Sequence, residues 1–313
     1  MTALPSPSDA PPSPRQDTDT RPEPVRAYLQ YLAAERRLSP HTLAAYQRDL
    51  GILCRHAGDT PLQDLTPVDI RGLIVRLRGE NLSPASVARQ LSAWRGFYVF
   101  ARRRLGFPVN PCIGLRPPKS AKRLPDVLSP DACAHLLDLP AEHILDRRDH
   151  AMFELLYSSG LRLAELAGLD LATVDMRAGE AQVTGKGGKT RIVPVGAQAL
   201  AALAAWLPLR QTLARNGVAA LFVNRRGDRL SPRSIQLRLA RWAARAGVPQ
   251  HVHPHMLRHA FATHMLQSSG DLRAVQELLG HASIGTTQVY THLDWQHLAK
   301  VYDQTHPRAR RKN

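Results

Sequence analysis

The sequence predicts a mainly α-helical protein of two domains with one small β-hairpin, an α+β fold. Its 313 residues exceed a usual single domain of roughly 100–200 residues, so two domains are expected. Dipeptides that begin helices, Ser-Pro or Thr-Pro, recur along the chain at Ser39, Thr66, Ser83 and Ser129. A clear strand pattern occurs only within residues 181–195.

The first domain is expected to be a small bundle of four helices spanning residues 23–108. Residues 1–22 are rich in Pro, Ser and Asp with almost nothing to bury, so we expect a disordered tail there. Leu29, Tyr31 and Leu32 mark the first helix. The other helices begin at Ser39-Pro40, at Thr66-Pro67 with Asp69 completing a capping box, and at Ser83-Pro84, the last running to about Arg104.

The fourth helix is predicted to have one apolar and one basic face. At 100° per residue, Val87, Leu91, Trp94 and Tyr98 fall within an arc of about 60°, and Arg89 and Arg103 point away from it. Residues 81–123 contain nine Lys or Arg and no acid, whereas a solvated face normally mixes both signs. We interpret this region as a surface that contacts phosphates. Its candidate DNA contacts are Arg89, Arg95, Arg102, Arg103, Lys119, Lys122 and Arg123.

A basic linker is expected at 109–125, a second and mostly helical domain at 126–300, and a basic tail at 301–313. The hairpin strands of this domain are AQVTG (181–185) and KTRIVPV (189–195), joined by a Gly-rich turn. Residues 206–270 contain ten Arg and one acid. Because both domains carry basic surface, we expect two lobes that grip one duplex as a C-shaped clamp.

The overall charge points to a polyanionic partner. Lys and Arg number 42 against 26 Asp and Glu, a net charge of +16, and the sequence pI is about 10.6. Since no apolar run approaches a membrane span of roughly 20 residues and no secretory leader is evident, we expect no membrane association and a cytoplasmic location. The three cysteines, Cys54, Cys112 and Cys133, form neither a disulfide framework nor a zinc ribbon pattern.

Several polar residues of the second domain are candidates for catalysis, although each is weak evidence alone. Arg162 and Glu165 stand three apart after a glycine, where a surface ion pair is the ordinary explanation. Lys186 occupies the predicted hairpin tip, and a lysine is common there. The remaining candidates are His255 and Arg258 on one apparent helix, His281, and Tyr290 nine residues further on.

Taken together and in this order, these segments resemble the tyrosine recombinases, over nearly the whole chain. The family pattern of G-L-R-x-x-E, a hairpin Lys, H-x-x-R, a His or Trp, and a Tyr nine residues on is present without a gap. The end of the chain, residues 291–313, resembles the XerC branch. The resemblance implies a helical core-binding (SAM-like) DNA-binding domain at 23–108 and a catalytic domain at 126–300.

The resemblance also implies a role for each candidate. Tyr290 would be the nucleophile that forms a 3′-phosphotyrosine, and Lys186 the general acid. Arg162 and Arg258 suit the phosphoryl charge, because a guanidinium binds phosphate oxygens bidentately. His255 would manage the phenolic proton, because an imidazole titrates near neutrality. His281 would donate a hydrogen bond to the phosphate or pack beside the tyrosine, Glu165 would orient a cation, and neither a metal nor ATP is expected.

The partners that the resemblance implies are a double-stranded DNA recombination site and a XerD-like recombinase in a heterotetramer. It further implies the resolution of chromosome dimers before cell division, activation by a septal DNA translocase, and docking of a C-terminal helix at about residues 293–302 on a neighbouring subunit.

Other interpretations remain open to different degrees. A phage or transposon integrase would share this chemistry, and a non-catalytic DNA-binding protein would share the charge but has no need of Tyr290. A P-loop ending at Gly188-Lys189-Thr190 fails because Val183 stands where a glycine is required. A metallohydrolase could use His251, His253, His255 and His259, but no acid lies within residues 251–265.

Overall fold

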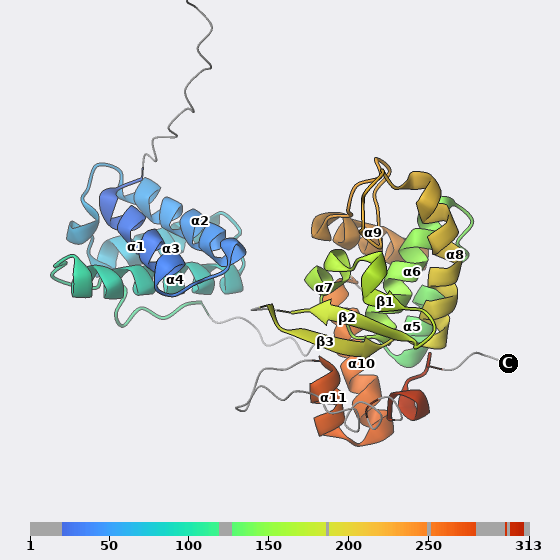
Figure 1. Cartoon of the computed structure of the whole chain (residues 1–313). Helices are drawn as coiled ribbons and strands as arrows, with labels where there is room; N and C mark the ends of the chain where they lie inside the picture. Colours follow the sequence, from blue (N-terminus) through green and yellow to red (C-terminus); the bar gives the residue numbers. More distant parts are fainter. Residues whose placement is uncertain are drawn as a thin grey trace, which may run out of the picture. The chain divides into compact units, whose positions relative to one another are not determined.

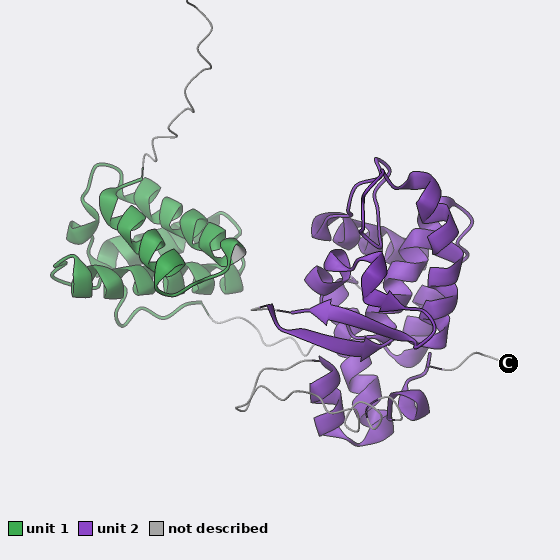
Figure 2. Ribbon diagram, viewed as in Figure 1, with its two compact units in different colours: residues 1–122 green, residues 123–313 purple. Residues whose placement is uncertain are grey.

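The computed structural model describes residues 21–118, 127–185, 188–248, 252–279, 298 and 301–309. The chain divides into two compact units, residues 1–122 and residues 123–313 (Figure 2). The expected disordered tail falls almost wholly outside the described residues, as do residues 119–125 of the expected basic linker at 109–125. Within the described residues, no helix is both long enough and apolar enough to cross a bilayer.

In its described residues, 21–118, the first unit is a bundle of four α-helices and one 3-10 turn (Figure 1). Its helices are α1 (Glu23–Ala34), α2 (Pro40–Ala57), α3 (Pro67–Gly79) and α4 (Pro84–Arg104), with the turn at Leu62–Asp64. The predicted starting points are confirmed. Ser39 and Ser83 cap α2 and α4 by accepting from a backbone N–H, and Thr66 and Asp69 form the capping box of α3.

The core of this unit is built on the predicted apolar face of α4. Val87, Leu91, Trp94 and Tyr98 are all buried. The two aromatic polar groups find backbone acceptors, since the indole of Trp94 donates to Asp49 O at 2.8 Å and the Tyr98 hydroxyl donates to Leu62 O at 2.9 Å. The opposite face of α4 carries exposed arginines, among them Arg102 and Arg103.

The second unit packs helices around α6 (Ile144–Ser158), a large part of which is buried, and sets a small sheet against them (Figure 1). Its other helices are α5 (Pro130–Leu137), α7 (Leu163–Gly168), α8 (Ala197–Leu213), α9 (Pro232–Arg245), α10 (Pro254–Ser269) and α11 (Leu272–Leu279). Ser129 caps α5 as predicted.

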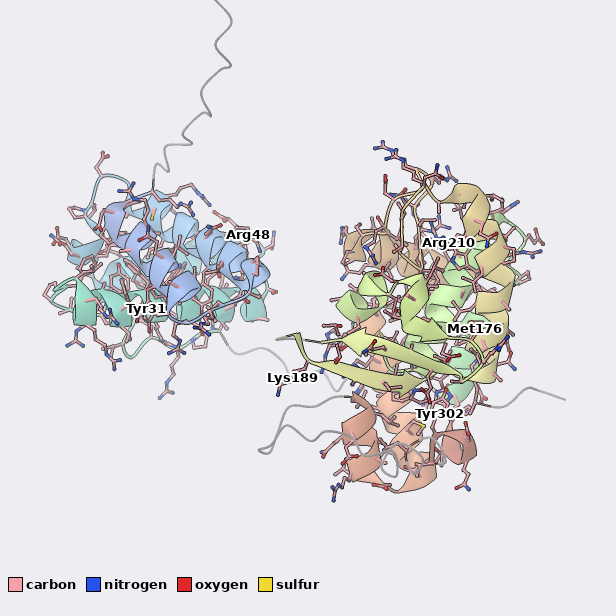
Figure 3. All side chains as sticks on the ribbon, viewed as in Figure 1. Tyr31, Arg48, Met176, Lys189, Arg210 and Tyr302 are labelled. Carbon is pink, nitrogen blue, oxygen red and sulfur yellow. The ribbon has the colours of Figure 1, made fainter. Side chains whose placement is uncertain are left out.

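The sheet contains the predicted antiparallel hairpin, β2 (Glu180–Thr184) and β3 (Thr190–Pro194), in the register Val183 to Arg191. A strand of two residues, β1 (Val174–Asp175), lies beside β2 and was not predicted, because two residues show no alternation. Lys189 is exposed and projects from the outer end of the hairpin (Figure 3).

Residues 301–309, which we expected in a basic tail, are packed into the second unit. Tyr302 is buried, and Ala309 O accepts a hydrogen bond from Ala197 N at 3.0 Å. Arg308 is buried as well, and its Nε donates to Glu154 Oε2 on α6 at 2.9 Å. The buried contacts of the second unit therefore extend almost to the end of the chain.

Candidate active site

Arg162 lies at the junction of α6 and α7, held by a carboxylate of the following helix. Glu165, the third residue of α7, accepts from Arg162 N at 2.8 Å and from Arg162 Nη1 at 2.8 Å. The pair is not the surface ion pair that its spacing suggests, because only 2% of the Glu165 side chain is exposed. Glu165 orients Arg162, as the sequence analysis expected of it.

Arg258 reaches the same place from α10. Its Nη1 donates to Gly160 O, its Nη2 donates to Leu279 O at 2.7 Å, and Nη1 lies 3.9 Å from Glu165 Oε2. Burial, and next the positive charge of Arg162, lower the pKa of Arg258 from 12.5 to about 10. The guanidinium therefore stays charged at neutral pH while being fixed in position by backbone carbonyls.

Arg191 is a third arginine at this carboxylate, and sequence reasoning missed it. From β3 it donates Nη1 to Glu165 Oε1 at 2.6 Å and Nη2 to Glu165 Oε2 at 3.0 Å. Alternation along KTRIVPV puts Arg191 on the same face of β3 as Val193, and this face is the buried one, whereas Ile192 is 46% exposed. The register with buried Val183 is the feature that would have revealed it.

The hairpin turn begins beside the arginine cluster, which consists of Arg162, Arg191 and Arg258 around Glu165. A Cβ placed on Gly185 would lie 3.4 Å from Glu165 Oε1 and 3.8 Å from Arg162 Nη1. Lys186, the next residue, lies outside the described residues. The described end of β2 therefore brings the chain to the arginines just before the predicted general acid.

The described structure includes three of the six predicted catalytic residues, Arg162, His255 and Arg258. His255 is exposed at the start of α10, one turn before Arg258. Lys186, His281 and Tyr290 lie outside the described residues. The last described residue before His281 is Leu279, whose carbonyl is bound by Arg258.

The charges of the cluster add up to a site for an anion. Arg162, Arg191 and Arg258 contribute three positive charges against the one negative charge of Glu165. Burial alone would raise the pKa of Glu165, but the hydrogen bonds from Arg191 and Arg162 outweigh it and leave the pKa below the usual value. In the described part of the chain, no three His, Cys, Asp or Glu residues come together as metal ligands.

Each of the two units matches a known protein family. Residues 25–105 match the family described as Phage integrase, N-terminal SAM-like domain, and residues 126–297 match the Phage integrase family. The chain belongs to the phage integrase family. The predicted resemblance to tyrosine recombinases is thereby confirmed, and with it the class of enzyme, which breaks and rejoins DNA.

Relatives of this chain match it over most of its length. The Tyrosine recombinase XerC of Ralstonia pickettii is 53% identical over 310 residues, covering 92% of this chain and 94% of the relative. That of Pseudomonas syringae pv. syringae is 53% identical over 290 residues, covering 91% and 96%. The XerC branch suggested by the sequence is therefore confirmed.

Solved structures support the mainly helical fold with its small sheet. A lambda integrase (75–356) dimer bound to a COC′ core site matches with a TM-score of 0.66 at 20% identity, covering 85% of this chain and 98% of that one. The XerH site-specific recombinase in a post-cleavage complex with difH matches with a TM-score of 0.66 at 22% identity, covering 88% and 84%. At these identities the likeness concerns the fold alone.

In the SAM-like unit of this integrase-family chain, the predicted DNA contacts have different surroundings. Arg102 and Arg103 are exposed on α4. Arg89 is half exposed and paired with the buried carboxylate of Asp49. Arg95 donates Nε to Cys112 O at 3.2 Å and Nη2 to Leu115 O, so it fastens the segment after α4. Lys119, Lys122 and Arg123 lie outside the described residues.

Several arginines of the span at 206–270 are buried or paired with carboxylates. Arg210 donates to Ala220 O at 2.8 Å, and Arg238 pairs with the buried Asp149. Three exposed arginines of the span, Arg215, Arg229 and Arg245, pair with carboxylates. The other exposed arginines of the span are Arg225, Arg226, Arg233 and Arg241. The net charge of a span therefore overstates its free basic surface, because acids elsewhere in the chain neutralise part of it.

Proposed function

We propose that this XerC-type recombinase cleaves one DNA strand by attack of the Tyr290 phenolic oxygen on a phosphorus at a specific site. The bond from phosphorus to the tyrosine oxygen forms, and the bond to the 5′ oxygen breaks. The phenolic proton passes to His255, and Lys186 protonates the departing 5′ oxygen. The products are a 3′-phosphotyrosine and a free 5′-OH.

The observation that carries this proposal is the arginine cluster on Glu165. The pentacovalent transition state places negative charge on two non-bridging oxygens, and fixed guanidinium groups stabilise that charge without reorganising. Arg258 is fixed by Gly160 O and Leu279 O, and Arg162 by Glu165. His281 contributes a hydrogen bond to the phosphate or packs beside Tyr290.

Rejoining follows from the same chemistry. One ester replaces another, so the energy of the broken bond is kept in the phosphotyrosine, and a 5′-OH from a second strand reverses the step. The reaction therefore needs neither ATP nor a metal ion.

The biological setting is proposed from the relatives named Tyrosine recombinase XerC. The chain pairs with a XerD-like recombinase in a heterotetramer on two DNA sites, each pair of subunits exchanging one pair of strands. It acts in the cytoplasm to resolve chromosome dimers at cell division, with a septal DNA translocase as activator. Arg102 and Arg103, exposed on α4, are proposed contacts to the DNA backbone.

The test is covalent trapping on a nicked suicide duplex. The labelled DNA is expected to become attached to the full-length protein, and the tryptic peptide that carries the label is expected to contain Tyr290. Tyr290→Phe should bind duplex with unchanged affinity and trap none. Tyr31→Phe is the matched control, because Tyr31 packs against Phe100 in the first unit, and its trapping should equal that of the wild type. Attachment by Tyr290→Phe would contradict the proposal.

A further inference from the structure

We propose that Arg191 is a positioning residue for strand cleavage, holding Glu165 and the end of α11 so that Arg162 and Arg258 meet the phosphate in a fixed arrangement. The inference rests on the proposed function. It concerns a residue outside the predicted catalytic set, whose side chain enters the cluster from the sheet.

The Arg191 guanidinium is occupied by protein acceptors. Only 8% of its side chain is exposed, and each of its three nitrogens has a protein acceptor. Nη1 and Nη2 bind the two oxygens of Glu165, and Nε donates to Leu278 O at 3.3 Å. The Arg162 side chain, by contrast, is 36% exposed. The Arg258 side chain is 9% exposed, but among the described residues only its Nη1 and Nη2 donate to acceptors, whereas all three nitrogens of Arg191 do. We infer that Arg191 acts on the phosphate through its neighbours.

The first neighbour is Glu165, which Arg191 binds with both arms of its fork. Such a bidentate pair fixes the plane of the carboxylate as well as its position. Glu165 in turn binds Arg162 through Oε1 and, at the backbone, through Oε2. The orientation of Arg162 therefore depends on Arg191 through one shared carboxylate.

The second neighbour is the C-terminal end of α11. Consecutive carbonyls there are bound by two arginines of the cluster, Leu278 O by Arg191 and Leu279 O by Arg258. Unsatisfied carbonyls at a helix end need such donors. Arg191 thus joins strand β3 to the helix that directly precedes the chain segment carrying His281 and Tyr290.

Electrostatics give Arg191 a measurable effect. Within the described residues, the charged groups that face Glu165 are Arg162 at its own helix start, Arg191 from β3 and Arg258 from α10. Burial raises the pKa of Glu165, and the Arg191 hydrogen bonds are foremost among the effects that lower it. Without Arg191, Glu165 would take up a proton at a higher pH and release Arg162.

The experiment measures single-turnover cleavage of suicide duplex against pH for the full-length wild type, Arg191→Gln, Arg191→Lys and Arg191→Gln combined with Glu165→Gln. Arg191→Gln is expected to cleave about 10- to 100-fold more slowly at unchanged duplex affinity, because misplaced groups cost that much. On acidification, the cleavage rate of Arg191→Gln should begin to fall at a higher pH than that of the wild type. This shifts the acidic limb of its pH–rate profile upward. Arg191→Lys should keep the acidic limb near that of the wild type while cleaving more slowly, since an ammonium retains the charge but not the fork.

The double variant distinguishes positioning from bulk stability. Glu165→Gln mimics the protonated carboxyl that releases Arg162, so the double variant should cleave no faster than Arg191→Gln and should lose the shift of the acidic limb. Arg210→Gln is the matched control, because Arg210 is also buried and binds the carbonyls of Val218 and Ala220. It should lower the melting temperature and leave the acidic limb in place.

Two failures are distinguishable. If the wild type traps no DNA, the proposed function fails and the inference falls with it. If the wild type cleaves and Arg191→Gln cleaves equally fast with the same acidic limb, only the role of Arg191 is overturned. If Arg191→Gln does not fold, Arg191→Lys decides, and cleavage by that variant at the wild-type rate would contradict the proposal.

Discussion

The ring of Phe261 occupies the space that a Cβ on Gly160 would need. Such an atom would lie 2.4 Å from Phe261 Cδ1, and Gly160 has a φ of +57°. This close approach lets the carbonyl of Gly160 accept a hydrogen bond from Arg258, which precedes Phe261 by less than one helical turn. Gly160, two residues after the end of α6, therefore helps to support the arginine cluster.

Gly160→Ala is expected to lower both stability and cleavage. The methyl group would force Phe261 and α10 away, at a typical cost of about 1–3 kcal/mol for an overpacked core, and Arg258 would move with α10. Thermal unfolding and suicide-duplex trapping measure the two effects. Gly247→Ala is the matched control, because Gly247 has a φ of +66° and nothing lies within 4 Å of the place that a Cβ would take there. It should show backbone strain alone, so equal effects in both variants would contradict the steric explanation.

Arg162→Lys is expected to be severely impaired although it keeps the charge. Arg162 must hold Glu165 with one part of its guanidinium and stabilise the phosphoryl oxygens with another, and an ammonium cannot do both. A loss on the order of 100-fold in cleavage rate is expected, comparable to the removal of one oxyanion donor. Duplex affinity, measured by gel shift, should change little. Cleavage near the wild-type rate would assign Arg162 a structural role only.

Cleavage is expected to persist in the presence of EDTA. The arginine cluster supplies the positive charge that a divalent ion would otherwise provide at the phosphate. Trapping assays with and without chelator, at matched ionic strength, measure this directly. Loss of trapping on chelation and its return on adding a divalent salt would revive the metal interpretation of the histidines near His255.

What could be predicted from the sequence was local. Ser39, Ser83 and Ser129 announce helix starts because the capping hydrogen bond closes within three residues. The hairpin was predicted for the same reason, since its strands are adjacent along the chain. Arg162 and Arg258 were found as part of a family pattern and not from their surroundings.

What could not be predicted depends on contacts between distant parts of the chain. Arg191 meets Glu165 only because the sheet packs beside α7, and an alternating strand pattern does not reveal an ion pair inside a core. Residues 301–309 look like a solvated basic tail because their charge partners lie elsewhere in the sequence. Arg308 pairs with Glu154 on α6 and with Asp138 after α5, which no spacing rule connects to it.

Arg308→Gln is expected to destabilise the second unit strongly. Glu154 is buried, and without Arg308 its carboxylate loses its closest cation, which typically costs about 3–5 kcal/mol. The melting temperature should fall, and adding Glu154→Gln should recover part of the loss because no buried charge is then left unpaired. Arg215→Gln is the control, since its pair with Asp228 is exposed and should matter little. A double variant less stable than Arg308→Gln would contradict this account.

His306 is expected to make the second unit less stable as the pH falls below neutrality. Burial lowers the pKa of His306 to about 3, with the nearby His264 acting in the same direction. Its Nδ1 accepts from Arg308 N at 3.1 Å, and its ring stacks on Tyr302 with centroids 5.1 Å apart. The folded protein therefore holds this imidazole neutral.

The sign of this pH dependence follows from the pKa of His306 in the folded and in the unfolded chain. In the unfolded chain the imidazole titrates near its reference pKa of about 6.5, so between that value and about 3 the unfolded state binds more protons. Stability from His306 is then complete above about pH 6.5 and decreases on acidification, by about 2 kcal/mol at pH 5. Denaturant unfolding between pH 7 and pH 5 measures it. His306→Gln should flatten that dependence in part, because burial also lowers the pKa of His264. An equally steep dependence in His306→Gln and in the wild type would show that the imidazole at this position is not held neutral.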